Sequence, residues 1–120
     1  MQDLFSENRQ MITVDVSSFD TSNAKNMRGI FYCCDHLEYL NLGNFDTSSM
    51  TTISHIFGYC INLKYLNIKK FILSENIDIS TFEQTFKSIP TNTKYCIEDE
   101  YTKNKLIPDI TSVCSDICFQ

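Results

Sequence analysis

The feature that most constrains this chain is an internal repeat with a 26-residue period. The tetrapeptide FDTS stands at residues 19–22 and again at residues 45–48. When the sequence is aligned with itself at this period, apolar residues fall on apolar residues, and the polar positions match less closely. Burial therefore sets the period, as in proteins built from stacked structural repeats. One repeat cannot bury its own apolar side, so neighbouring repeats must pack against one another.

Each period contains a short apolar alternation of the form L-x-x-L-x-L. It occurs as LEYLNL at residues 37–42 and as LKYLNI at residues 63–68. Apolar residues at every second position predict a short strand, with Leu40 and Leu42 pointing inward and Asn41 outward.

The second half of the period has a different apolar spacing, in residues 22–31 and again in residues 48–57. Apolar residues three or four positions apart predict a short helix with one buried face. The preceding DTS is typical of a helix start, because its side-chain oxygens accept hydrogen bonds from free N–H groups, and we expect Ser22 and Ser48 to be the caps. The residues predicted to be buried are Ala24, Met27, Ile30, Phe31, Met50, Ile53, Ile56 and Phe57.

One strand and one helix per period predict an α/β fold with a parallel sheet, because the helix and its turns supply the crossover that parallel strands require. The expected hand of this crossover is right-handed. We therefore predict a right-handed leucine-rich-repeat-like solenoid over residues 1–97. It begins in the middle of a repeat, since Met1 aligns with Met27.

The last repeat is irregular. Phe86 follows Phe57 three positions later than the period predicts, which indicates an insertion around residues 74–77. TKYCI at residues 93–97 resembles a final strand. Residues 98–120 have no repeat character and contain two cysteines, so we expect them to form a cysteine-containing cap over the end of the solenoid.

These motifs resemble the repeat of a known family. The segment from Leu37 to Leu63 contains L-x-x-L-x-L, N-F-D-T-S and I-x-x-I-F blocks in that order, and the preceding repeat has M-x-x-I-F at residues 27–31. It is similar to the 26-residue repeat of BspA-like leucine-rich-repeat surface proteins, the DUF285-type repeat. The likeness is close over residues 11–62 and looser over residues 1–10 and 63–89.

The resemblance implies a cell-surface or secreted protein that binds other proteins or a host surface, with no catalytic residue and no cofactor. It also implies a column of phenylalanines, Phe19, Phe45 and Phe71, where ordinary leucine-rich repeats have asparagine or cysteine. The chain contains no signal peptide and no apolar run near the ~20 residues of a membrane span. We expect a fragment of a longer protein, with no membrane insertion of its own.

The charge of the chain narrows the class of partner. The formal net charge is -5 and the isoelectric point is about 4.8. Such a chain lacks the basic face that meets nucleic-acid phosphates. We expect a protein ligand or a host or cell-surface component as the partner, and no nucleic acid.

The sequence CCDH at residues 33–36 brings together residue types found in nucleophile and metal sites. Cys34 and Cys60 occupy the same position of the repeat, where a small buried thiol packs well. The positions of Asp35 and His36 hold isoleucine and asparagine in the next repeat, which lack that chemistry. Three interpretations remain open: buried structural thiols, a Cys34–Cys60 disulfide, or a catalytic or metal site. We favour buried thiols and expect no enzymatic activity.

The other cysteines near the tail are Cys96, Cys114 and Cys118. A disulfide from Cys96 to Cys114 or Cys118 would fasten the tail to the last strand, as expected in an extracellular cap. Free thiols and a zinc site remain alternatives, although a fourth metal ligand is missing nearby.

The outward positions of the strands form the predicted binding face. Tyrosine is enriched in binding hot spots, although a tyrosine ladder can also serve only cross-strand packing. The function is therefore either protein binding and adhesion, a structural spacer, or an intracellular interaction scaffold. The predicted face consists of Thr13, Asp15, Glu38, Tyr39, Asn41, Lys64, Tyr65 and Asn67.

Overall fold

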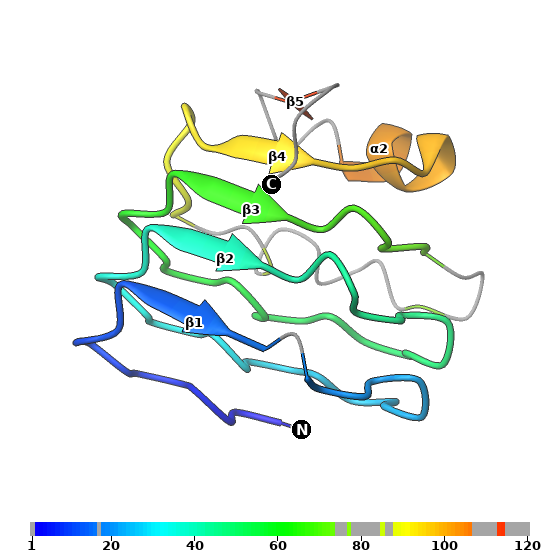
Figure 1. Ribbon diagram of the computed structural model, residues 1–120, viewed down its shortest axis with the longest axis horizontal. Helices are drawn as coiled ribbons and strands as arrows, with labels where there is room; N and C mark the ends of the chain where they lie inside the picture. Colours follow the sequence, from blue (N-terminus) through cyan, green and yellow to red (C-terminus); the bar gives the residue numbers. More distant parts are fainter. Residues whose placement is uncertain are drawn as a thin grey trace.

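The computed structural model of the chain describes residues 2–16, 18–73, 77, 85, 88–106 and 113–114. Its central feature is one open sheet of parallel strands, in which neighbours along the chain are neighbours in the sheet (Figure 1). The strands are β1 (Thr13–Asp15), β2 (Tyr39–Asn41), β3 (Tyr65–Asn67), β4 (Lys94–Cys96) and β5 (Val113–Cys114). Each period thus contributes one strand to a parallel stack, as predicted, and the arrangement is compatible with a solenoid-like repeat fold.

The strand register follows the sequence period. Thr13 pairs with Tyr39, and Tyr39 pairs with Tyr65, each one 26-residue period further along the chain. Tyr65 then pairs with Lys94, which lies three positions beyond the place that the period predicts. This shift confirms the inserted residues before the final repeat, although most of the predicted insertion point lies outside the described residues.

The interior is a stack of equivalent apolar side chains from successive repeats. Leu40 and Leu66 are neighbours in adjacent strands, and neither is exposed to solvent. Their positions repeat because every strand enters the sheet in the same direction. Deeply buried members of this core are Met27, Ile30, Leu37, Leu42, Met50, Ile53, Ile56, Leu63 and Ile68.

Among the described residues, phenylalanine rings form two columns through this interior. In the predicted column, Phe45 and Phe71 are buried and Phe19 is half-buried. The second column consists of Phe5, Phe31 and Phe57. Its successive ring centroids are 5.4 Å and 6.5 Å apart, and the rings are nearly parallel. Offset aromatic stacking at such distances adds to the stabilisation from burial.

The helices predicted over residues 22–31 and 48–57 are wrong, because both segments consist of turns and short extended stretches. Each segment contains a residue with a positive φ, Gly29 or His55, which a right-handed α-helix does not accommodate. Such residues recur at equivalent places in successive repeats. They are Asp3, Glu7, Gly29, Cys33, His55 and Tyr59.

Hydrogen bonds in these turns join neighbouring repeats. In a helix each N–H would donate to a carbonyl four residues back. Here alternate N–H groups instead donate to carbonyls of the next repeat, at 2.8 Å to 3.1 Å. The donors are Gly29, Phe31 and Cys33, and the acceptors are Ser54, Ile56 and Gly58. The turns therefore form a second hydrogen-bonded ladder opposite the sheet.

The predicted serine caps also have a different role. The main-chain N–H groups of Ser22 and Ser48 donate to the side chains of Asp20 and Asp46, at 3.0 Å and 2.9 Å. Aspartate is thus the acceptor at each FDTS corner, in a turn and not at a helix start. The pKa of both carboxyls is lowered, first by the serine side-chain hydrogen bonds and then by the serine N–H groups.

The threonine of FDTS links one repeat to the next. Thr21 is buried, and its hydroxyl donates to the carbonyl of Asp46 and accepts from the Asp46 N–H, at 3.2 Å and 2.8 Å. Thr47 makes the same pair of contacts with Ile72, both at 2.9 Å. The repeated tetrapeptide therefore places a phenylalanine in the core, an aspartate in the turn and a threonine between repeats.

The chain after β4 continues into helix α2 (Glu100–Leu106) and strand β5. Asp99 accepts a hydrogen bond from the Thr102 N–H at 2.8 Å, which caps the start of the helix. The buried Thr102 hydroxyl accepts from the Leu73 N–H at 2.9 Å. The sheet thus extends by β5 into the segment predicted to be a cap. Among the described residues, no helix has the length and apolarity needed to cross a membrane.

Candidate functional site

The most distinctive surface feature is a pair of stacked tyrosines on the outer face of the sheet. Tyr39 in β2 and Tyr65 in β3 are paired in the strand register. Their ring centroids are 5.5 Å apart, with an angle of 13° between the ring planes. The residues are 37% and 38% exposed, so each ring is packed against its neighbour and still reaches solvent.

Charged residues flank this tyrosine pair. The Lys64 ammonium lies 3.1 Å from the Glu38 carboxylate, one position before each tyrosine. The hydrogen bond and the charge of Glu38 raise the pKa of Lys64. In the strand register Tyr65 pairs with Lys94, and Tyr39 pairs with Thr13. Both Lys94 and Thr13 are exposed.

Asn67, predicted to belong to the exposed face, is only 4% exposed. Its side-chain amide donates to Asn41 at 3.0 Å, and its oxygen accepts from the Lys69 N–H at 2.9 Å. Asn41 also accepts from the Gly43 N–H at 2.9 Å. A side chain at Gly43 would collide with this amide, since its Cβ would lie 2.8 Å from the Asn67 nitrogen. Asn67 therefore braces the strand ends and offers little surface, whereas Asn41 and Asp15 are exposed.

Cys34 and Cys60 are fully buried free thiols, which contradicts the alternative of a disulfide between them. Each thiol donates to a main-chain carbonyl of the preceding repeat at 3.1 Å, Cys34 to Phe5 and Cys60 to Phe31. Burial raises the pKa of Cys34 to about 11, and it raises the pKa of Cys60 as well. Burial therefore keeps both thiols protonated at neutral pH, whereas a cysteine nucleophile reacts as the thiolate.

The residues of the CCDH sequence do not converge on one site. His36 and Asp35 contact each other at 3.2 Å on the surface, while Cys34 points into the core. Cys33 is a half-buried free thiol. Across the described part of the chain, no group of three or more His, Cys, Asp or Glu residues is placed to hold a metal ion.

Cys96 in β4 is disulfide-bonded. The side chain of Cys114 and the whole of Cys118 lie outside the described residues. The predicted pairing of Cys96 with one of these two cysteines therefore stays a prediction.

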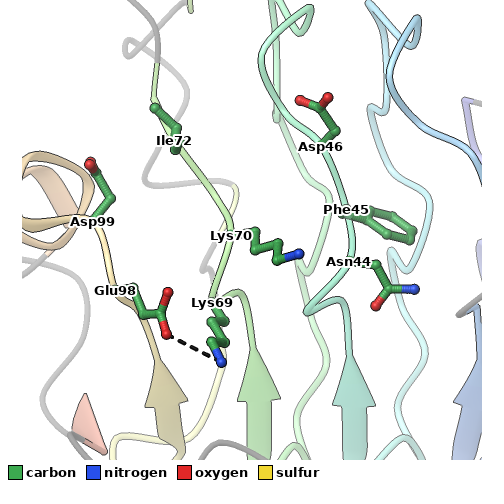
Figure 2. Close-up of a pocket in the computed structure, with 8 residues that line it drawn as sticks. All are labelled: Asn44, Phe45, Asp46, Lys69, Lys70, Ile72, Glu98 and Asp99. Atoms are coloured by element: carbon green, nitrogen blue, oxygen red, sulfur yellow. Dashed lines mark ion pairs between the residues drawn. The ribbon is translucent and has the colours of Figure 1, made fainter.

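A hollow of about 530 Å³ lies where the loops leave the carboxyl ends of β2, β3 and β4 (Figure 2). The sequence interpretation did not identify it. The sequence contained a signal for this hollow, because adjacent charged residues follow two of the strands, Lys69–Lys70 and Glu98–Asp99. The carboxyl ends of parallel strands meet at one edge of the sheet, so these charges come together there. The hollow is lined by Asn44, Phe45, Asp46, Lys69, Lys70, Ile72, Glu98 and Asp99.

A second hollow, of about 330 Å³, lies on the turn ladder. The Tyr32 ring meets His55 and Tyr59 edge to face, with both pairs of centroids 5.6 Å apart. Gly29 has a positive φ, and a side chain there would collide with the Asp3 carboxylate. This hollow is lined by Gln2, Asp3, Arg28, Gly29, Tyr32 and His55.

Comparison with known proteins identifies a family for most of the chain. A family model described as "Mycoplasma protein of unknown function, DUF285" matches residues 1–105. The match spans both FDTS copies and strands β1 to β4. No curated protein and no solved structure matches the chain.

Proposed function

This chain belongs to the DUF285 family, and on that premise we propose that it is a non-enzymatic protein-binding module of a BspA-like leucine-rich-repeat protein. We further propose that the parent protein is secreted or lies at the cell surface and uses the module for adhesion. The observation that carries the proposal is the exposed, stacked pair of Tyr39 and Tyr65.

The tyrosine pair has the physical properties of a binding anchor. Each ring is held by its neighbour before any partner arrives, so little side-chain freedom remains to be lost on binding. A tyrosine offers a large apolar surface together with a hydroxyl that hydrogen-bonds to a partner. The Glu38–Lys64 ion pair and Lys94 supply the polar rim that surrounds such anchors in protein interfaces.

The state of the buried cysteines supports a non-enzymatic role. Cys34 lies in the core with a pKa of about 11, and its thiol is engaged by the Phe5 carbonyl. A catalytic cysteine would need an accessible, low-pKa thiol beside a base. The adjacent His36 contacts Asp35 instead.

The proposal is tested by measuring binding with matched variants. The tagged chain is screened against a panel of purified cell-surface and extracellular proteins, and each hit is titrated by biolayer interferometry. Tyr39→Ala combined with Tyr65→Ala is expected to weaken binding at least tenfold, because central aromatic anchors each contribute more than about 1 kcal/mol. Tyr101→Ala is the control, since Tyr101 is 53% exposed on α2, which lies beyond the carboxyl end of β4 (Figure 1).

The remaining outcomes decide between the candidate functions. If the double variant binds as well as the wild type, while circular dichroism is unchanged, the sheet face is not the binding site. A spacer predicts that no protein of the panel binds, and that an unrelated solenoid of equal length replaces this one without loss of function. An intracellular scaffold predicts that the parent protein resists protease added to intact cells.

A further inference from the structure

The hollow at the carboxyl ends of the strands adjoins the tyrosine face. Asn44 follows β2 by three residues, and Lys69 and Glu98 follow β3 and β4 by two residues. The strands that present Tyr39, Tyr65 and Lys94 are therefore the same strands that end at the hollow. A partner seated on the tyrosines could reach the hollow with one side chain.

The three carboxylates of the hollow already have partners. Asp46 accepts from the Ser48 N–H at 2.9 Å, and Asp99 accepts from the Thr102 N–H at 2.8 Å. Glu98 lies 3.2 Å from the Lys69 ammonium, the ion pair drawn in Figure 2. These contacts orient the acidic groups within the protein itself.

Lys70 is the exception among the charged residues of the hollow. It is exposed, and it forms no hydrogen bond or ion pair with any described residue. Its side chain extends across the hollow toward the loop that contains Asn44 and Phe45 (Figure 2). Ile72, two residues further along, is 55% exposed and gives the same hollow an apolar wall.

We propose that this hollow binds a carboxylate carried on a short aliphatic stem, as in a glutamate side chain of the protein partner. The Lys70 ammonium would pair with the carboxylate, and Ile72 would contact the methylene groups of the stem. The identity of the carrier as a protein partner rests on the proposed function, whereas the chemistry of the hollow does not. The competing occupant is a cation, attracted by the three carboxylates.

Three small probes with four carbon atoms each test this chemistry directly. Butyrate is the anionic probe, butyramide its neutral counterpart and butylammonium its cationic counterpart. Each is titrated at constant ionic strength into the full chain labelled with ¹³C at isoleucine δ1 methyl groups. The Ile72 methyl resonance reports the hollow, and the exposed Ile12 and Ile61 report non-specific effects.

The expected result is a saturable shift of Ile72 with butyrate and no matching shift at Ile12 or Ile61. Butyramide is expected to bind about threefold more weakly, because one exposed ion pair is lost. Lys70→Met should remove this preference for butyrate. Lys25→Met should keep it, because Lys25 is exposed outside the hollow and its loss changes the net charge equally.

The proposal is overturned if butylammonium shifts Ile72 at lower concentration than butyrate, or if no probe gives a saturable shift. It is also overturned if Lys70→Met and Lys25→Met respond alike. The variant with both Tyr39→Ala and Tyr65→Ala separates the two proposals. It should retain the butyrate response even if protein binding at the tyrosine face proves to be wrong.

Discussion

At the scale of single residues, several polar side chains of the interior bond to the main chain of a neighbouring repeat. The hydroxyl of Thr21 bonds to Asp46, and the thiols of Cys34 and Cys60 bond to the carbonyls of Phe5 and Phe31. A polar group in a core is costly unless it has such a partner. These residues therefore join repeats, which explains why a cysteine recurs at this position of the period.

This role predicts the order in which the cysteines react. At pH 8 and in native buffer, iodoacetamide should modify the half-buried Cys33, while Cys34 and Cys60 stay unmodified over the same time. Because the pKa of Cys34 is raised to about 11, its thiolate fraction at pH 8 is far below that of an ordinary cysteine. Peptide mapping by mass spectrometry measures the modification at each position.

The pH dependence of stability follows from the same raised pKa of Cys34. Protonated Cys34 is the form that the folded state favours, so its contribution to stability is present below pH ~8.5 and is lost as the pH rises toward about 11. The control for the iodoacetamide experiment is labelling in denaturant, where all three thiols should react at similar rates. Rapid native labelling of Cys34 would contradict its burial and would reopen the question of a reactive thiol.

At the scale of elements, the sequence predicted the strands well and the helices wrongly. The alternation at Leu40 and Leu42 has only one simple geometric solution, a strand with two inward side chains. Ile30 and Phe31 follow Met27 by three and four residues. This spacing was ambiguous, because consecutive turns, like a helix, can bring such residues to one side of the chain. The positive φ at Gly29 and at Cys33 leads the chain into turns. Of these two residues, only the glycine is of a type that indicates a positive φ in the sequence.

The turns depend on the threonine links between repeats, which a single substitution can test. Thr47→Val keeps the shape of the side chain and removes both hydrogen bonds to Ile72. We expect a loss of about 1–3 kcal/mol in the free energy of unfolding, because two hydrogen bonds of the buried Thr47 hydroxyl are lost, each of which contributes about 0.5–1.5 kcal/mol. Urea denaturation followed by circular dichroism gives this value.

The matched control is Thr51→Val. Thr51 is exposed and its hydroxyl also bonds to a neighbouring repeat, at 3.1 Å from the Lys25 carbonyl. Water can replace that bond, and the Thr51 N–H donates to the same carbonyl at 2.9 Å, so the loss should stay within about 0.5 kcal/mol. Equal losses at Thr47 and Thr51 would show that burial of the link does not matter.

At the scale of the whole molecule, the 26-residue period predicted the contacts that successive repeats share. It could not predict the features in which one repeat differs from the next. The pairing of Tyr39 with Tyr65 follows from the 26-residue period alone. The hollow beside it could not be found in this way, because it depends on the irregular spacing that brings Glu98 next to Lys69. The burial of Asn67 likewise reflects its contacts with Asn41 and Lys69 and not its place in the alternation.

Stacking of the repeats predicts that one substitution has unequal effects in different repeats. Phe19 and Phe45 occupy the same position of the period, but Phe45 is 1% exposed and Phe19 is half-buried. Phe45→Ala should cost about 3–5 kcal/mol of unfolding free energy, because a large side chain is lost from between two repeats. Phe19→Ala should cost clearly less, since part of its ring is already in contact with solvent.

Phe45→Leu and Phe19→Leu provide a milder pair if the alanine variants fail to fold. Equal losses in urea denaturation would mean that each repeat buries its phenylalanine by itself, which would contradict a core shared between repeats.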